Sequence, residues 1–152
     1  MGRILIDGFP RSGNTFFYEL LSASFLNIDI PQFRHSVKTF SPETYVLLRD
    51  PQYSISSFMS TFRHDDAKSA EDWWLRYYNT AVENNVKFIL FEDLTKDTTE
   101  VLDRISRETG LPYITTELYN LNKNESKESY KTDYNFDKAK DLYFSLLKNL
   151  NI

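Results

Sequence analysis

Apolar positions along the chain follow two periods, which predict alternating strands and helices. Continuous apolar runs at 4–6, 44–48 and 86–91 (ILI, TYVLL and VKFILF) are typical of strands that are buried on both faces of a parallel sheet. The segments after them repeat apolar residues about every 3.6 positions, which indicates amphipathic helices. This alternation predicts an α/β fold of three layers, with a small parallel sheet flanked by helices.

The helices are bounded by recognisable start and stop residues. They are expected to begin near Gly13 or Asn14 and at Pro51, and to cover 69–84, 95–109 and 136–150. We expect a short connection at Asn27–Pro31, a short strand at 31–34 that leads to His35, and a loop over 35–43. Residues 113–135 lack periodicity and predict a loop or a mobile lid. No repeat or linker divides residues 1–152, so one domain is expected.

The first strand runs into a loop that suits an anion. Asp7 ends the apolar run, and Gly8 and Gly13 frame Pro10, Arg11 and Ser12. A tight loop of this kind directs backbone N–H groups at one point, and the positive end of the following helix dipole adds to them. The sequence therefore predicts a phosphate-like ligand at this loop.

The loop differs from the nucleoside-triphosphate pattern G-x-x-x-x-G-K-[ST] at the decisive position. Gly8, Gly13 and Thr15 fit, but Asn14 replaces the lysine that reaches the β- and γ-phosphates. A neutral amide cannot neutralise a triphosphate, which argues against ATP or GTP hydrolysis. The cation is instead Arg11, whose planar guanidinium can grip a phosphate or the bridging oxygen of a leaving group.

The stretch GFPRSGNTFFYELL resembles the donor-binding loop of the sulfotransferase family, which carries Lys or Arg at the position of Arg11. In that family the loop holds the 5′-phosphosulfate end of 3′-phosphoadenosine-5′-phosphosulfate (PAPS). The resemblance implies a P-loop-like fold and a donor site. The implied contacts at the 5′ end are Pro10, Arg11, Ser12, Gly13, Asn14 and Thr15.

Two further blocks resemble the same family, in the family's order. VLLRDPQYSISSF is similar to its 3′-phosphate-binding segment, in which an arginine at a strand end and a serine eight residues later clamp the phosphate; these are Arg49 and Ser57 here. The strand ending in VKFILFEDL is similar to the segment that places an aromatic residue, here Phe91, beside the adenine. Glu92 and Asp93 are expected to cap the next helix rather than to act on a substrate.

The resemblance implies sulfuryl transfer, with Arg11 stabilising the leaving 5′-phosphate. The family takes its base from the region before the second strand, where this chain offers His35, with Glu43 as the reserve candidate. A histidine in the charged stretch RHDD, His64, is expected to be a solvated surface residue. Many family members close the donor site with a glycine-bearing C-terminal segment. No glycine follows Gly110 here, and Lys123, Lys127 and Lys131 could replace that segment electrostatically.

Composition narrows the class of partner. A net charge of −4 with dispersed basic residues argues against a nucleic-acid-binding face. The absence of cysteine and the presence of only two histidines exclude a thiolate metal site and argue against a histidine cage. No charged leader with an apolar core is evident, and no apolar segment has the length needed to cross a bilayer. A cytoplasmic protein without membrane contact is therefore expected.

Three functions remain open, in a definite order. The first is a PAPS-dependent sulfotransferase that acts on a hydroxyl or amine of a small molecule, glycan or peptide, releases adenosine-3′,5′-bisphosphate and requires no metal. The second is a sulfotransferase-like nucleotide-binding protein without activity. The third is a P-loop nucleoside or nucleotide kinase, which Asn14 disfavours. The acceptor and the oligomeric state do not follow from the sequence.

Overall fold

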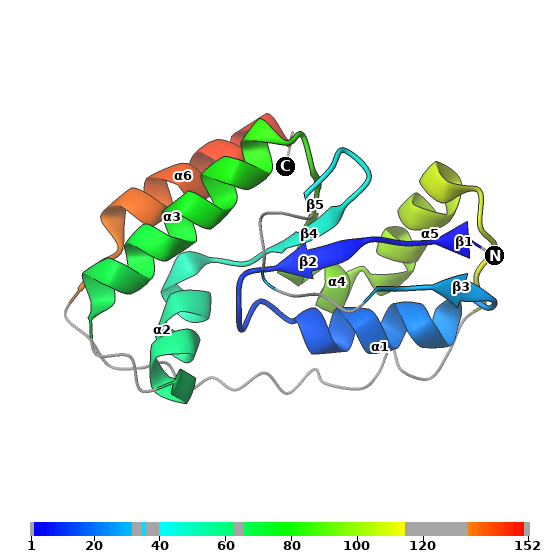
Figure 1. Ribbon diagram of the computed structural model, residues 1–152, viewed down its shortest axis with the longest axis horizontal. Helices are drawn as coiled ribbons and strands as arrows, with labels where there is room; N and C mark the ends of the chain where they lie inside the picture. Colours follow the sequence, from blue (N-terminus) through cyan, green and yellow to red (C-terminus); the bar gives the residue numbers. More distant parts are fainter. Residues whose placement is uncertain (1, 32–34, 36–39, 63–65, 115–133, 151–152) are drawn as a thin grey trace.

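The computed structural model describes residues 2–31, 35, 40–62, 66–114 and 134–150 (Figure 1). Its elements, in chain order, are β1 (Gly2–Arg3), β2 (Ile6–Gly8), α1 (Asn14–Ser24), β3 (Ile28–Asp29), β4 (Tyr45–Leu48), α2 (Pro51–Phe62), α3 (Ala67–Glu83), β5 (Lys87–Leu90), α4 (Phe91–Lys96), α5 (Thr98–Thr109) and α6 (Asp137–Asn149). The strands predicted at 44–48 and 86–91 and the helices predicted from Asn14 and Pro51 are confirmed.

Several boundaries differ from the expectation. The first strand, expected at 4–6, is observed as β1 at Gly2–Arg3 and β2 at Ile6–Gly8. Phe91 opens α4 instead of closing the strand before it. The single helix expected over 95–109 is two helices, because Asp97, with φ −120° and ψ 47°, leaves the helical conformation between α4 and α5. The expected connection at Asn27–Pro31 contains β3, whereas most of the short strand expected at 31–34 lies outside the described residues, as does most of the segment 113–135.

The first strand segment, β1 and β2, is a topological switch point, because the strands that follow it in the chain pair on its two opposite sides. β2, β4 and β5 form a parallel sheet in that order, and β1 pairs with β3 in parallel. β1 and β2 lie on one extended segment: the amide of Ile4 donates to the carbonyl of Asp29 on one side, and the carbonyl of Leu5 accepts from the amide of Tyr45 on the other. The chain thus has β3 and β4 on opposite sides of this segment. Ligands of open α/β sheets bind at the carboxyl ends of strands at such a point.

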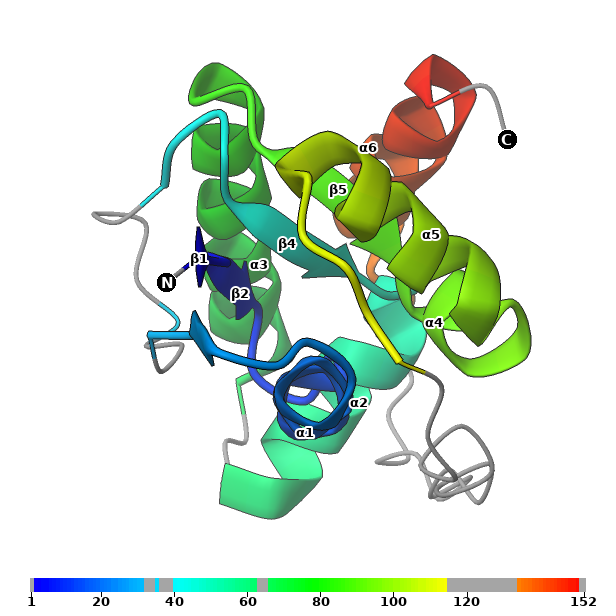
Figure 2. The same cartoon turned by 90° about the vertical axis from the view of Figure 1, so that its right-hand side faces the viewer.

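Alternating side chains of the central strand supply both faces of the sheet. Tyr45 and Leu47 belong to one buried cluster together with apolar residues of α1, α4 and α5. Val46 and Leu48 belong to a second cluster with residues of α2, α3 and α6. Figure 2 shows α1 and α5 on one side of the strands and α3 on the other. The three-layer arrangement predicted from the sequence is confirmed, and burial on both faces explains the uninterrupted apolar run of β4.

A buried carboxylate joins the last helix to the rest of the fold. Glu71, on α3, is only 1% exposed. It accepts hydrogen bonds from the Tyr134 hydroxyl at 2.6 Å and from the backbone amide of Ala139 at 3.1 Å. Ala139 lies in the first turn of α6, where a carboxylate satisfies a backbone N–H without an intrahelical acceptor and complements the helix dipole. The packing of α6 against α3 is visible in Figure 1.

Glu71→Ala is expected to lower the free energy of unfolding by about 2 to 3 kcal/mol, because it removes two hydrogen bonds to a charged acceptor and leaves the buried amide of Ala139 without its partner. Urea denaturation followed by circular dichroism measures the change. Glu83→Ala, at an exposed position at the other end of α3, is the matched control and is expected to change stability by less than about 0.5 kcal/mol. Equal effects of the two substitutions would contradict a capping role for Glu71.

Candidate functional site

The loop between β2 and α1 has the backbone geometry of a tight turn into a helix. Gly13 is the N-cap of α1 with a φ of 95°, and Arg11 has a φ of 68°. The amide of Ser12 donates to the carbonyl of Phe9 at 3.1 Å, which closes the turn. The first amides of α1 have no acceptor within the helix, so they are available to an anion at the carboxyl end of β2.

Two glycines of this loop are required by close approach. A Cβ on Gly13 would lie 2.8 Å from the Phe91 ring, and the φ of 95° adds backbone strain for any other residue. A Cβ on Gly8 would collide with the side-chain oxygen of Asn14. The glycines that frame the loop in the sequence are therefore explained by neighbours that pack directly against their Cα atoms.

Asn14 does not point toward the mouth of the loop. It is buried, and its Nδ2 donates to the carbonyl of Gly8 at 3.0 Å and to that of Phe9 at 3.2 Å. The residue that stands in place of the phosphate-binding lysine therefore ties the loop to the strand before it. This geometry supports the interpretation that the loop is not a triphosphate site.

Three of the predicted donor contacts meet at the switch point. Arg11 is exposed, and its Nε donates to the Ser57 hydroxyl on α2 at 3.0 Å. Arg49, which follows β4, donates from Nη1 to the carbonyl of Arg11 at 3.1 Å. The loop, the end of β4 and α2 thus bring two guanidinium groups and a hydroxyl together beside the N-terminus of α1. Positive charge and hydroxyl donors in this arrangement suit phosphate oxygens.

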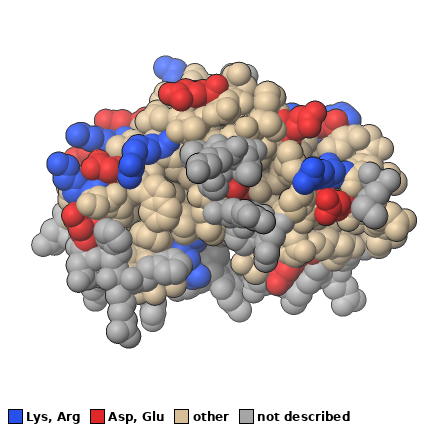
Figure 3. All heavy atoms as spheres, viewed as in Figure 1, with Lys and Arg blue, Asp and Glu red and all other residues tan. Residues whose placement is uncertain are grey.

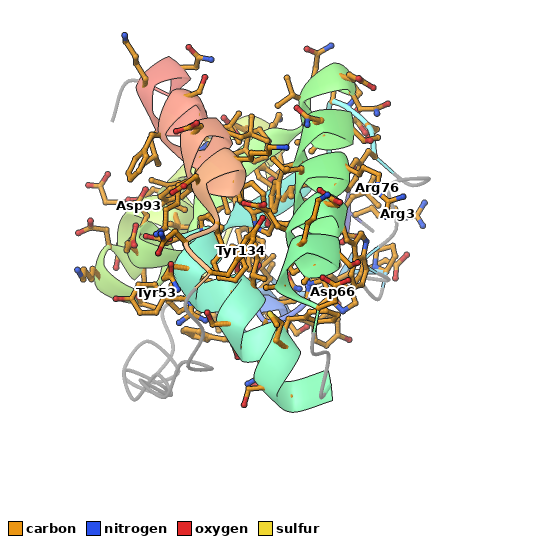
Figure 4. The ribbon with its side chains drawn as sticks, turned by 90° about the vertical axis from the view of Figure 1, so that its left-hand side faces the viewer. Arg3, Tyr53, Asp66, Arg76, Asp93 and Tyr134 are labelled. Carbon is orange, nitrogen blue, oxygen red and sulfur yellow. The ribbon has the colours of Figure 1, made fainter. Side chains whose placement is uncertain are left out.

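Aromatic rings hold Arg49 in place. Its guanidinium carbon lies 4.2 Å from the centroid of the Phe91 ring and 5.9 Å from that of Tyr53, an exposed residue on α2 (Figure 4). Phe91, which the resemblance places beside an adenine, is 7% exposed and lies between Gly13 and Arg49. The ring therefore supports the arginine by a cation–π contact on one face.

Asp7 is a buried carboxylate whose partner was not predicted from the sequence, and it fixes the end of β2 before the loop. Asp7 is 2% exposed and accepts a hydrogen bond from the Tyr77 hydroxyl on α3. Burial, and then the Asp7 carboxylate, raise the pKa of Tyr77 well above its ordinary value, so the phenol stays a donor. Tyr78 donates to the carbonyl of Leu47 at 2.6 Å. The signal in the sequence was an aspartate at the end of a buried apolar run, which requires a partner.

Of the two candidate bases, the structure places His35 at the loop. Its Nδ1 lies 2.7 Å from the carbonyl oxygen of Gly8. Glu43 is exposed and precedes β4; because Tyr45 pairs with Ile6 in a parallel ladder, Glu43 lies toward the amino end of the sheet. His35 and the donor loop are thus neighbours, whereas Glu43 lies toward the opposite edge.

Pro10 and Ser12 are buried in the loop, and Thr15 is exposed in the first turn of α1. Glu92 and Asp93 do not cap the helix expected at 95–109. They lie within the first turn of α4, whose N-cap is Leu90 without a side-chain hydrogen bond, and there acidic residues complement the helix dipole. His64, Lys123, Lys127 and Lys131 fall outside the described residues.

Neither metal-binding clusters nor membrane-spanning helices are found among the described residues. Within residues 2–31, 35, 40–62, 66–114 and 134–150, no group of three or more His, Asp or Glu side chains is placed to hold a metal ion. In the same ranges, none of the helices combines the length and the apolar character that crossing a bilayer requires. On the face shown in Figure 3, basic and acidic side chains lie near one another over the helices.

Comparison with known proteins places the fold. No protein-family model matches the sequence, and a search of curated proteins finds no match. A solved structure does match: mouse sulfotransferase SULT7A1 complexed with PAP, with a TM-score of 0.55 and 13% sequence identity. The fold is sulfotransferase-like. The match covers 78% of this chain and 62% of the mouse protein, so the sulfotransferase-like chain spans less than two thirds of that relative.

Proposed function

We propose that this protein is a PAPS-dependent sulfotransferase that transfers a sulfuryl group to a hydroxyl or amine acceptor. The observation that carries the proposal is the convergence of Arg11, Ser57 and Arg49 beside the N-terminus of α1. The sulfotransferase-like fold supports it, because the structural neighbour is complexed with PAP, the spent donor adenosine-3′,5′-bisphosphate.

The residues of the site fit a ligand with two anionic ends. The N-terminus of α1 and the Arg11 guanidinium suit a 5′-phosphosulfate. Arg49 and Ser57, which both contact Arg11, would bind a phosphate on the 3′ oxygen. The left-handed backbone at Arg11 and Gly13 shapes the loop around the first of these groups. These hydrogen-bond donors and positive charges therefore suit PAPS better than a magnesium-bound triphosphate. Asn14 is neutral and offers a triphosphate no cation.

The chain's own residues would supply three functions to the reaction. The bound donor supplies the sulfuryl group, which forms a new bond to the acceptor oxygen or nitrogen as its bond to the 5′-phosphate oxygen breaks. Arg11 would stabilise the negative charge that passes to that phosphate oxygen. His35 would take the acceptor's proton. Arg49 and Ser57 would hold the remote phosphate and so fix the donor's orientation.

A nucleotide-binding protein without turnover is the second candidate. The sulfotransferase-like fold supports it equally, because a structural match at 13% identity carries the fold and not the turnover. Such a protein would bind adenosine-3′,5′-bisphosphate but would not release it from PAPS in the presence of any acceptor. The kinase is the third candidate, and magnesium-dependent ADP binding would favour it.

Calorimetric titration with adenosine-3′,5′-bisphosphate, ADP and AMP, each with and without magnesium, tests the proposal. We expect the bisphosphate to bind most tightly and without magnesium. Arg49→Ala is expected to weaken this binding by about 10- to 100-fold, since it removes a charge-assisted contact to a phosphate. Arg76→Ala, exposed on α3 (Figure 4), is the matched control and should leave the affinity unchanged.

Two outcomes of this titration would contradict the proposal. Preference for ADP in the presence of magnesium would favour a kinase. Failure to bind any of the three nucleotides would remove the donor site altogether. Equal affinities of the Arg49→Ala and Arg76→Ala variants would show that Arg49 has been assigned the wrong role.

A further inference from the structure

The backbone carbonyl of Gly8 accepts hydrogen bonds from two side chains, and in this way it links the loop between β2 and α1 to the candidate base His35. The carbonyl oxygen of Gly8 lies 2.7 Å from Nδ1 of His35 and 3.0 Å from Nδ2 of Asn14. A carbonyl oxygen only accepts hydrogen bonds, so both nitrogens must donate to it. The 3.5 Å separation between these two nitrogens agrees with two donors sharing one acceptor.

This bond decides which nitrogen of the imidazole can act as a base. A neutral imidazole carries a proton on one nitrogen and a lone pair on the other. Because Nδ1 of His35 must carry the proton that it donates to Gly8, the lone pair is on Nε2. The protein thus selects one tautomer before any acceptor arrives.

Asn14 holds the acceptor group in position. Its amide is buried and bonds to two successive carbonyls, those of Gly8 and Phe9, which fixes the direction of the chain where it leaves β2. Gly8 permits this approach, because any Cβ there would collide with the Asn14 side chain. On its other side, the amide of Gly8 donates to Asp7, which is itself held by Tyr77. Both polar groups of Gly8 are therefore tethered.

We propose that Asn14 is a positioning residue for His35: it fixes the Gly8 carbonyl, and that carbonyl orients the imidazole and keeps its proton on Nδ1. The position that carries a phosphate-binding lysine in triphosphate loops here serves the base instead. The donor loop and the base form one hydrogen-bonded unit. The catalytic meaning of this unit rests on the proposed sulfuryl transfer, whereas the tautomer does not.

Nitrogen-15 NMR of the imidazole groups tests the inference directly. The chain has only two histidines, so the His64→Gln variant assigns both sets of signals. At a pH where the ring is neutral, His35 should show the proton on Nδ1 in the free protein. Asn14→Ala should shift His35 toward a mixture of tautomers. It should also lower kcat about 10²-fold, as expected when a reacting group loses its orientation.

Asn84→Ala is the matched control. The Asn84 amide also donates to a backbone carbonyl, that of Thr80 at 2.8 Å, but at the end of α3. This variant should leave the His35 signals and kcat unchanged. If it disturbed them as much as Asn14→Ala, the effect would be one of general stability and the inference would fail.

The result that overturns the inference needs no variant. A neutral His35 with its proton on Nε2 in the wild-type protein would exclude the Gly8 carbonyl as its partner, even if Asn14→Ala did not fold. An unchanged tautomer in a folded Asn14→Ala protein would exclude Asn14. If the tautomer were as expected but the wild-type protein showed no transfer, the sulfotransferase proposal would fail and the positioning of His35 would stand.

Discussion

Arg11→Ala is expected to lower the kcat of sulfuryl transfer by about 10³-fold, the scale on which an electrostatic stabiliser of a developing anion acts. The side chain is exposed and borders the N-terminus of α1, so its removal should change stability by less than about 0.5 kcal/mol. The rate is measured as adenosine-3′,5′-bisphosphate released from PAPS in the presence of a panel of hydroxyl and amine acceptors.

Arg11→Lys separates charge from general disturbance of the loop. A lysine keeps the positive charge as a compact ammonium, so this variant should retain most of the turnover that Arg11→Ala loses. The lysine cannot reproduce the 3.0 Å bond from Nε to Ser57 in the same geometry, so a modest rise in KM for PAPS is expected. Full turnover by Arg11→Ala would contradict a role at the leaving group, whatever the lysine variant did.

The parts of the site that the sequence predicted are those encoded locally. Gly8, Pro10 and Gly13 mark the loop within a few positions of one another. Arg49 ends a strand, and Ser57 lies on the helix that Pro51 begins shortly afterwards. Short-range patterns of this kind depend on backbone geometry that the residue types themselves impose. The structure joins these residues through Arg11, which donates to the Ser57 hydroxyl and accepts from Arg49 at its carbonyl; their role at a bound donor stays a prediction.

The parts that the sequence did not predict depend on contacts between distant segments. Tyr77 lies 70 positions from Asp7, and Tyr134 lies 63 positions from Glu71. Nothing local distinguishes a tyrosine that covers apolar surface from one that holds a buried carboxylate, because both satisfy the helical period. These two hydrogen-bonded pairs form only because the fold packs α3 against β2 and α6 against α3.

The boundary at Phe91 illustrates the same limit at short range. An apolar run that enters a helix directly, without a turn residue, shows no break at which the strand can be seen to end. In the structure Phe91 is the first residue of α4, and its ring packs where the missing Cβ of Gly13 leaves room for it. Likewise, Glu43 and His35 occupy the same stretch of sequence. Only the parallel register of β2 and β4 separates them in space.

His35→Asn is expected to lower kcat by about 10²- to 10⁴-fold, the usual contribution of a general base. An asparagine amide can place an N–H where Nδ1 stood and keep the bond to the Gly8 carbonyl, but it has no basic nitrogen. The variant should therefore retain its affinity for adenosine-3′,5′-bisphosphate, measured by calorimetry, while its turnover falls. A loss of kcat without a loss of binding is the pattern that a purely structural histidine cannot produce.

His35→Gln completes the comparison, because its longer side chain reaches the position of Nε2 and gives up the donor to Gly8. If His35 only supported the loop, the asparagine variant would keep its turnover and the glutamine variant would lose both turnover and nucleotide affinity. If His35 is the base, both variants lose turnover and only the glutamine variant disturbs the loop. The two substitutions differ by one methylene. Comparing them therefore separates the role of Nε2, the proposed base, from the role of Nδ1, which bonds to the Gly8 carbonyl.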